Sequence, residues 1–211
     1  MTEGGRSRAV RSADSDDEQY SRDAFVAAAM LGVGAVLLGE RFASDATAAG
    51  SAPSAARDRA IFRFALQLES LQARFYEDAR AHGRLRGELR EFAEVVADHE
   101  SQHEAAVARA ASQPLSKRTF DFRGVTRHPA KFAHAAQALE DLGVAAYNGQ
   151  LANLTDRGIT FAARIVSVEG RHAAWIRDLV GSPPAPRPAD PGEAASAVAS
   201  ALSALGFRRK R

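Results

Sequence analysis

Six side chains that can bind metal interrupt apolar stripes in this 211-residue sequence. Four glutamates and two histidines stand where a helical pattern predicts core residues: Glu69, Glu100, His103, Glu140, Glu169 and His172. Buried carboxylates are strongly destabilising unless they are protonated, paired or bound to metal. Two divalent cations would balance four carboxylates, and neutral imidazoles would complete the coordination without adding charge. These residues therefore predict a site for two metal ions.

The stripes around these residues predict four amphipathic helices, at about residues 57–81, 84–111, 129–154 and 156–180. Few residues separate the first two helices, or the last two, so each pair is expected to form an antiparallel hairpin. The segment 113–129 between the hairpins contains two prolines and is expected to be irregular. At about 3.3–3.6 Å per residue, it can run the full length of a bundle. We therefore expect an all-α four-helix bundle with one long crossover.

The two predicted hairpins resemble each other in sequence. Glu69 lies in a Leu-Glu-Ser-Leu segment followed by Tyr76, and Glu140 lies in a Leu-Glu-Asp-Leu segment followed by Tyr147. Each hairpin also carries one Glu-x-x-His pair, whose two side chains share a helix face. The halves are expected to meet about a pseudo-two-fold axis through the site. The two tyrosines would hydrogen-bond the ligands or carry electrons; the alternative is a pair of core aromatic residues with satisfied hydroxyls.

These segments resemble the ferritin-like domain family, which includes desiccation-related proteins and many exported, uncharacterised bacterial proteins. The resemblance covers about residues 57–181 and rests on residues 66–71, 100–103, 138–147 and 168–174. It implies a ferritin-like four-helix bundle that holds a di-iron carboxylate centre. It further implies that Glu100 and Glu169 bridge the metals and that Glu69 and Glu140 chelate them from the ends. His103 and His172 would each bind one metal.

The ligand set favours iron or manganese over copper, because these ions prefer hard oxygen donors. With iron, the resemblance implies a redox enzyme that uses O₂ or peroxide in ferroxidase or peroxide-scavenging chemistry, with Glu100 and Glu169 as its catalytic ligands. Manganese would imply peroxide dismutation. The alternative is a non-catalytic envelope or stress-protection protein whose metal site is structural or vestigial.

The two ends of the chain differ from its middle. Residues 1–49 contain a polar start, the uncharged apolar run Ala24–Gly39 and an Ala-x-Ala site, which together predict an export signal. An uncleaved membrane anchor through Ala24–Gly39 and an apolar helix packed on the domain are the alternatives. We assign residues 50–181 to the bundle. Residues 182–211 comprise a proline-rich linker, a short helix at 193–207 and a basic tail. The expected location is therefore the periplasm, cell envelope or exterior.

The composition excludes several other kinds of site. The absence of cysteine rules out disulfides, thiolate zinc sites and iron–sulfur clusters. A net charge of only +2 argues against a nucleic-acid partner. The open expectation for assembly is a homodimer. His99 and Glu104 flank the motif of the second helix but are expected to point toward solvent.

Overall fold

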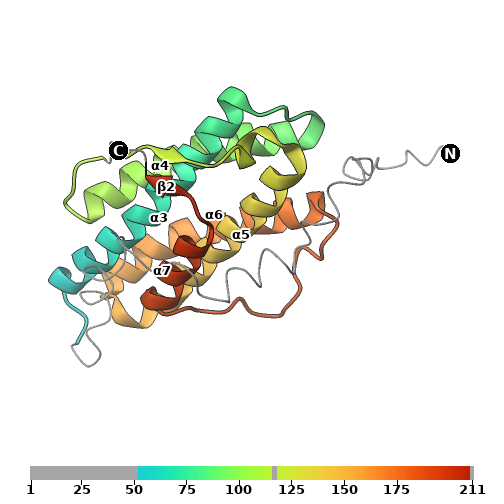
Figure 1. Ribbon diagram of the computed structural model, residues 1–211. Coiled ribbons are helices and arrows are strands. Elements are labelled where there is room, and N and C mark those ends of the chain that lie inside the picture. Colours follow the sequence, from blue (N-terminus) through green and yellow to red (C-terminus); the bar gives the residue numbers. More distant parts are fainter. Residues whose placement is uncertain (1–51, 116–117, 210–211) are drawn as a thin grey trace.

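The computed structural model describes residues 52–115 and 118–209 (Figure 1). Within these ranges the chain is mostly helical and has almost no strand, which confirms the expected all-α class. Its α-helices are α3 (Ala55–His82), α4 (Gly87–Ala110), α5 (Pro129–Gln150), α6 (Asp156–Leu179) and α7 (Ala195–Ala204). Two 3₁₀ turns, η1 (Val125–Arg127) and η2 (Leu151–Asn153), and two short strands, β1 (Phe120–Asp121) and β2 (Arg208–Arg209), complete the described structure. The expected export or anchor segment, Ala24–Gly39, lies outside the described residues.

Local sequence signals fix where α3, α5 and α6 begin. Ser54 caps α3 by accepting a hydrogen bond from the backbone N–H of Arg57 at 3.2 Å. Pro129 stands in the first turn of α5, where its missing N–H costs nothing. Thr155 caps α6 by accepting from the N–H of Gly158, while the backbone N–H of Thr155 donates to Asp58 at 2.9 Å. This last bond joins the start of α6 to the start of α3.

The four long helices form two hairpins. Helix α3 packs along α4, and α5 packs along α6, with α3 against α5 and α4 against α6 between the hairpins (Figure 1). The chain from α4 to α5 contains β1 and η1, and both contact α3. The structure therefore has the expected long crossover between two helical hairpins.

The apolar core is divided into two parts along the bundle axis. One cluster includes Phe75, Phe92, Phe132 and Ile176, and the other includes Phe62, Val107, Tyr147 and Ile165, so each of the four helices contributes to both clusters. On every helix, the glutamate of the predicted site lies in sequence between a member of one cluster and a member of the other. Apolar packing on both sides thus holds the polar residues at one level of the bundle.

The C-terminal segment folds back onto the bundle. Helix α7 packs against α5, and β2 pairs antiparallel with β1 of the crossover. The ring of Phe207 lies 5.8 Å from Phe75 and 5.2 Å from Phe122, measured between centroids. The expected terminal helix is therefore present but shorter than residues 193–207. None of the helices in the described ranges combines the length and hydrophobicity needed to cross a bilayer.

Candidate metal centre

The structure brings all six predicted site residues together inside the bundle, from α3, α4, α5 and α6. Their donor atoms form two overlapping groups, in each of which the atoms lie within 4.8 Å of one another. The first group is Glu69, Glu100, His103 and Glu169. The second group is Glu100, Glu140, Glu169 and His172. Glu100 and Glu169 belong to both groups, so they occupy the middle of the cluster.

The carboxylates of the cluster are removed from solvent. Glu100, Glu140 and Glu169 are 0 % exposed and Glu69 is 1 % exposed. Such groups require charge compensation, because an unpaired buried charge costs several kcal/mol. The two histidines provide the ionic contacts that the structure shows for these glutamates. The electrostatics of the site therefore depend on how protons or cations are shared within the cluster.

Each histidine turns its Nδ1 atom toward the carboxylates. Nδ1 of His103 lies 2.9 Å from Glu169 Oε1 and 3.4 Å from Glu100 Oε1. Nδ1 of His172 lies 3.1 Å from Glu140 Oε2 and 3.3 Å from Glu100 Oε1. Oε1 of Glu100 therefore contacts both imidazoles, so the Glu100 carboxylate lies between the two histidines.

Without metal, this cluster retains protons. Burial opposes a charge on His103, but pairing with Glu100 and Glu169 outweighs it and raises the pKa to about 11. Burial is likewise outweighed at His172 by Glu100 and Glu140, which raises the pKa to about 10. Burial also opposes ionisation of Glu100, yet pairing with the two histidines lowers its pKa below the ordinary value. The metal-free site is therefore built around an ionised Glu100 between two imidazolium groups.

The other three glutamates hold protons more tightly than usual. Burial and the charge of Glu100 raise the pKa of Glu169 to about 8. Burial, followed by the charges of Glu100 and Glu169, raises the pKa of Glu69 well above its ordinary value. Burial also raises the pKa of Glu140. Positive charge brought into the cluster would favour the ionised form of all three.

Several buried atoms of the cluster lack a hydrogen bond of standard geometry. They are Glu69 Oε2, both carboxylate oxygens of Glu100, Nδ1 of His103 and both carboxylate oxygens of Glu169. Buried polar atoms are normally satisfied, so a group of buried polar atoms without hydrogen bonds requires an explanation. These atoms converge on one another at contact distance without forming aligned hydrogen bonds. The arrangement fits cations, because oxygen and imidazole nitrogen donors surround common points. The buried carboxylates and histidines can therefore hold metal ions.

Two tyrosines connect the hairpins through these carboxylates. Tyr76 on α3 donates its hydroxyl hydrogen to Glu140 Oε1 on α5 at 2.5 Å. Tyr147 on α5 donates to Glu69 Oε1 on α3 at the same distance, 2.5 Å. Burial, followed by the charge of the adjacent glutamate, raises the pKa of both phenols well above the ordinary value. Both tyrosines therefore remain neutral donors that orient Glu140 and Glu69, the terminal glutamates, each of which belongs to only one donor group.

Three polar residues near the cluster were not predicted to lie there from the sequence. Glu104 was expected in solvent but is 3 % exposed and paired with Arg74 at 3.2 Å. His99 was also expected in solvent, yet its Nδ1 lies 2.9 Å from Nε2 of His172. Buried Gln72 donates to Glu140 Oε1 at 3.3 Å. Helical spacing could have indicated Gln72 and His99, because they lie three residues after Glu69 and four before His103.

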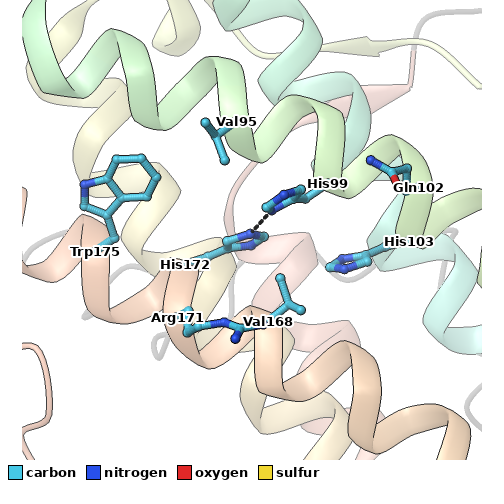
Figure 2. Close-up of a pocket in the computed structure, with 8 residues that line it drawn as sticks. All are labelled: Val95, His99, Gln102, His103, Val168, Arg171, His172 and Trp175. Carbon is cyan, nitrogen blue, oxygen red and sulfur yellow. Dashed lines mark hydrogen bonds between the residues drawn. The ribbon is translucent and has the colours of Figure 1, made fainter.

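A pocket leads from the protein surface to the two histidines. It lies between α4 and α6, has a volume of about 420 Å³ and is shown in Figure 2. It is lined by Val95, His99, Gln102, His103, Val168, Arg171, His172 and Trp175. Trp175 closes one side by packing edge-on against Phe92, at 5.3 Å between ring centroids. The imidazoles are therefore the part of the cluster that faces the pocket.

The fold and the site together define a helical-bundle protein with a carboxylate- and histidine-lined interior. A family model described as the ferritin-like domain matches residues 57–182, and the chain belongs to this family. The matched range covers α3 to α6 and hence every residue of the cluster. A comparison with curated proteins finds none that matches this chain.

Proposed function

We propose that this protein binds two metal ions, iron foremost, and oxidises Fe(II) with O₂ or peroxide. The observation that carries the proposal is the pair of overlapping donor groups that share Glu100 and Glu169. A single ion would require only one such group. Two groups with a common pair of carboxylates suit two adjacent cations, and the oxygen-rich donor set suits iron or manganese.

The residues divide into two positions. Glu69 and His103, with the shared glutamates, would hold the ion of the first position; Glu140 and His172, with the shared glutamates, would hold the ion of the second. When bound as Fe(II), the two ions supply two electrons, which with two protons reduce O₂ to hydrogen peroxide or hydrogen peroxide to two waters.

The remaining residues of the site orient the ligands and control access to them. Tyr76 and Tyr147 each fix one carboxylate oxygen of a terminal glutamate, leaving the other oxygen toward the cluster. The apolar clusters on either side exclude bulk water from the carboxylates. The pocket between α4 and α6 gives a small oxidant a route to the histidine side of the centre (Figure 2).

The test uses the full-length chain. Metal-free protein is titrated with Fe(II) under anaerobic conditions, bound iron is counted by elemental analysis, and oxidation is followed after addition of O₂ or hydrogen peroxide. We expect two bound ions and turnover with at least one oxidant. The matched control is Glu104→Gln, which removes a buried charge on α4 outside both donor groups and should retain both ions.

Different results would separate the alternatives. Fewer than two ions in the unaltered protein would refute the dinuclear centre. Two ions without oxidation by either oxidant would refute the enzymatic role and favour a non-catalytic protective protein. Selective loading with manganese, accompanied by disproportionation of peroxide, would favour the manganese variant over iron.

A further inference from the structure

The two halves of the centre differ at the position immediately before each Glu-x-x-His pair. The residue immediately before the pair is His99 on α4 and Val168 on α6. Both residues line the pocket, and Figure 2 shows them on opposite helices with the imidazoles between them. The pseudo-symmetry of the cluster is therefore broken by a polar residue on one side and an apolar residue on the other.

His99 reaches across the pocket to the histidine of the other helix. Its Nδ1 lies 2.9 Å from Nε2 of His172, and the two rings stack at 5.1 Å between centroids with an interplanar angle of 17° (Figure 2). The opposite nitrogen of His172 points to the carboxylates, at 3.1 Å from Glu140. Both ring nitrogens of His172 are thus engaged, and the ring is held from both sides.

His103 has no equivalent support. The corresponding residue on the facing helix is Val168, whose side chain cannot accept a hydrogen bond. Among the residues that the structure describes, none forms a hydrogen bond with Nε2 of His103. The side chain of His103 is also more exposed than that of His172, at 11 % against 4 %. The two candidate histidine ligands therefore differ in support and in exposure to the pocket.

We propose that His99 is a positioning residue that makes the two metal positions unequal, so that the position containing His172 binds its ion more tightly than the position containing His103. When Nδ1 of His172 binds metal, its Nε2 carries the hydrogen and donates it to Nδ1 of His99. Such a bond fixes the tautomer and orientation of a ligand and strengthens it as a donor, and its loss typically weakens binding by about 10–100-fold. The inference rests on the proposed dinuclear function.

This inequality gives the two ions different roles. The ion held by His172 would occupy the more permanent position, whereas the ion held by His103 would exchange more readily with solvent through the pocket. For Fe(II) oxidation, iron would then enter and leave through the position that contains His103. His99 would thereby influence the roles of both ions although it belongs to neither donor group.

The test measures the affinity of each position with Co(II), which reports binding through its visible absorbance and through calorimetry. The full-length, metal-free protein should bind two Co(II) ions with unequal affinities. His99→Phe keeps an aromatic ring against His172 but removes the acceptor, so the tighter affinity should fall by about 10–100-fold while the weaker one stays unchanged. His99→Asn places an amide oxygen near the original Nδ1 and should recover much of the loss.

Val168→His provides the reciprocal experiment. It introduces an imidazole opposite His103 and should strengthen the weaker position while leaving the tighter one unchanged. Two equal affinities in the unaltered protein, or unchanged affinities in folded His99→Phe, would overturn the inference but preserve the dinuclear centre. If circular dichroism shows that His99→Phe does not fold, an unchanged weaker affinity in Val168→His overturns it. Failure of the unaltered protein to bind two ions would instead overturn the proposed function.

Discussion

Tyr147 on α5 donates its hydroxyl hydrogen to Oε1 of Glu69 on α3, 2.5 Å away, and so joins the two hairpins at the level of the candidate metal centre. Tyr76 and Glu140 form the reciprocal bond in the opposite direction, also at 2.5 Å. Each tyrosine therefore lies on the helix of one terminal glutamate but orients the other. This exchange makes the geometry of the centre dependent on correct packing between the hairpins.

Replacing Tyr147 with phenylalanine should destabilise the metal-free protein. The substitution keeps the ring but leaves Oε1 of buried Glu69 without its donor, which should lower the free energy of unfolding by about 1–3 kcal/mol. Chemical denaturation of the full chain measures the effect. Ser200→Ala removes an exposed hydroxyl that bonds within α7, and should change the same quantity by less than about 0.5 kcal/mol. Equal unfolding free energies for the two variants would contradict the proposed contribution of Tyr147.

Terminal and shared glutamates should differ in the number of ions lost on substitution. Glu140 belongs only to the second donor group, so Glu140→Ala should remove about one metal equivalent. Glu100 belongs to both groups, so Glu100→Ala should weaken both positions. Elemental analysis after equilibration with Fe(II) or Mn(II) distinguishes these outcomes. Unchanged occupancy in Glu140→Ala would show that Glu140 is not a ligand.

Gly143 on α5 leaves room for the carboxylate of Glu169. A Cβ atom at this position would lie 2.6 Å from Oε2 of Glu169, so Gly143→Ala should displace that carboxylate and weaken both metal positions. The matched control is Gly170→Ala on α6, where a Cβ atom would meet no other atom within 4 Å. The control should bind metal normally and gain about 0.5–1 kcal/mol in stability from the better helix former. Normal metal affinity in both variants would refute the steric role of Gly143.

Metal binding should release protons. Burial disfavours the charged imidazoles, but pairing with carboxylates outweighs it and raises the pKa of His103 to about 11 and that of His172 to about 10. At neutral pH both rings of the metal-free protein are therefore imidazolium groups with a hydrogen on each nitrogen. The nitrogen that binds a metal ion must lose its hydrogen. Because metal binding displaces these protons, the metal affinity should rise as the pH increases toward these pKa values.

Calorimetry of full-length protein in two buffers with different heats of ionisation measures this release. Near neutral pH we expect about two protons from the histidines when both positions fill. Glu169 should add to this release, because burial and the charge of Glu100 raise its pKa to about 8. Binding without proton release, or an affinity independent of pH, would show that the imidazoles are neutral before metal arrives.

Much of the arrangement could be predicted because charged residues in apolar helical stripes are costly to bury. Glu69 and Glu140 each lie on a helix whose neighbouring positions are apolar, so their inward direction followed from periodicity alone. The long crossover followed from the length of the segment between α4 and α5. Export of the protein and its assembly as a homodimer, by contrast, stay predictions.

The prediction failed where a polar residue lies at the edge of a stripe. His99 and Glu104 on α4 were expected to face solvent, because they do not follow the spacing of Glu100 and His103. Each is instead engaged by a residue of another helix: His99 by His172, and Glu104 by Arg74. Periodicity on one helix gives the direction of a side chain but carries no information on which neighbouring helix covers it.

The pairing of β2 with β1 also bears on whether two copies of the chain could trade hairpins. Exchange of an identical element between two copies is a low-cost route to a dimer, and here it would require the segment between α4 and α5 to open. Here that segment is held by the strand pairing and by the packing of Phe207 against Phe75 and Phe122. An exchange of hairpins between two copies would first have to break this strand pairing and the contacts of Phe207, so the C-terminal segment opposes it.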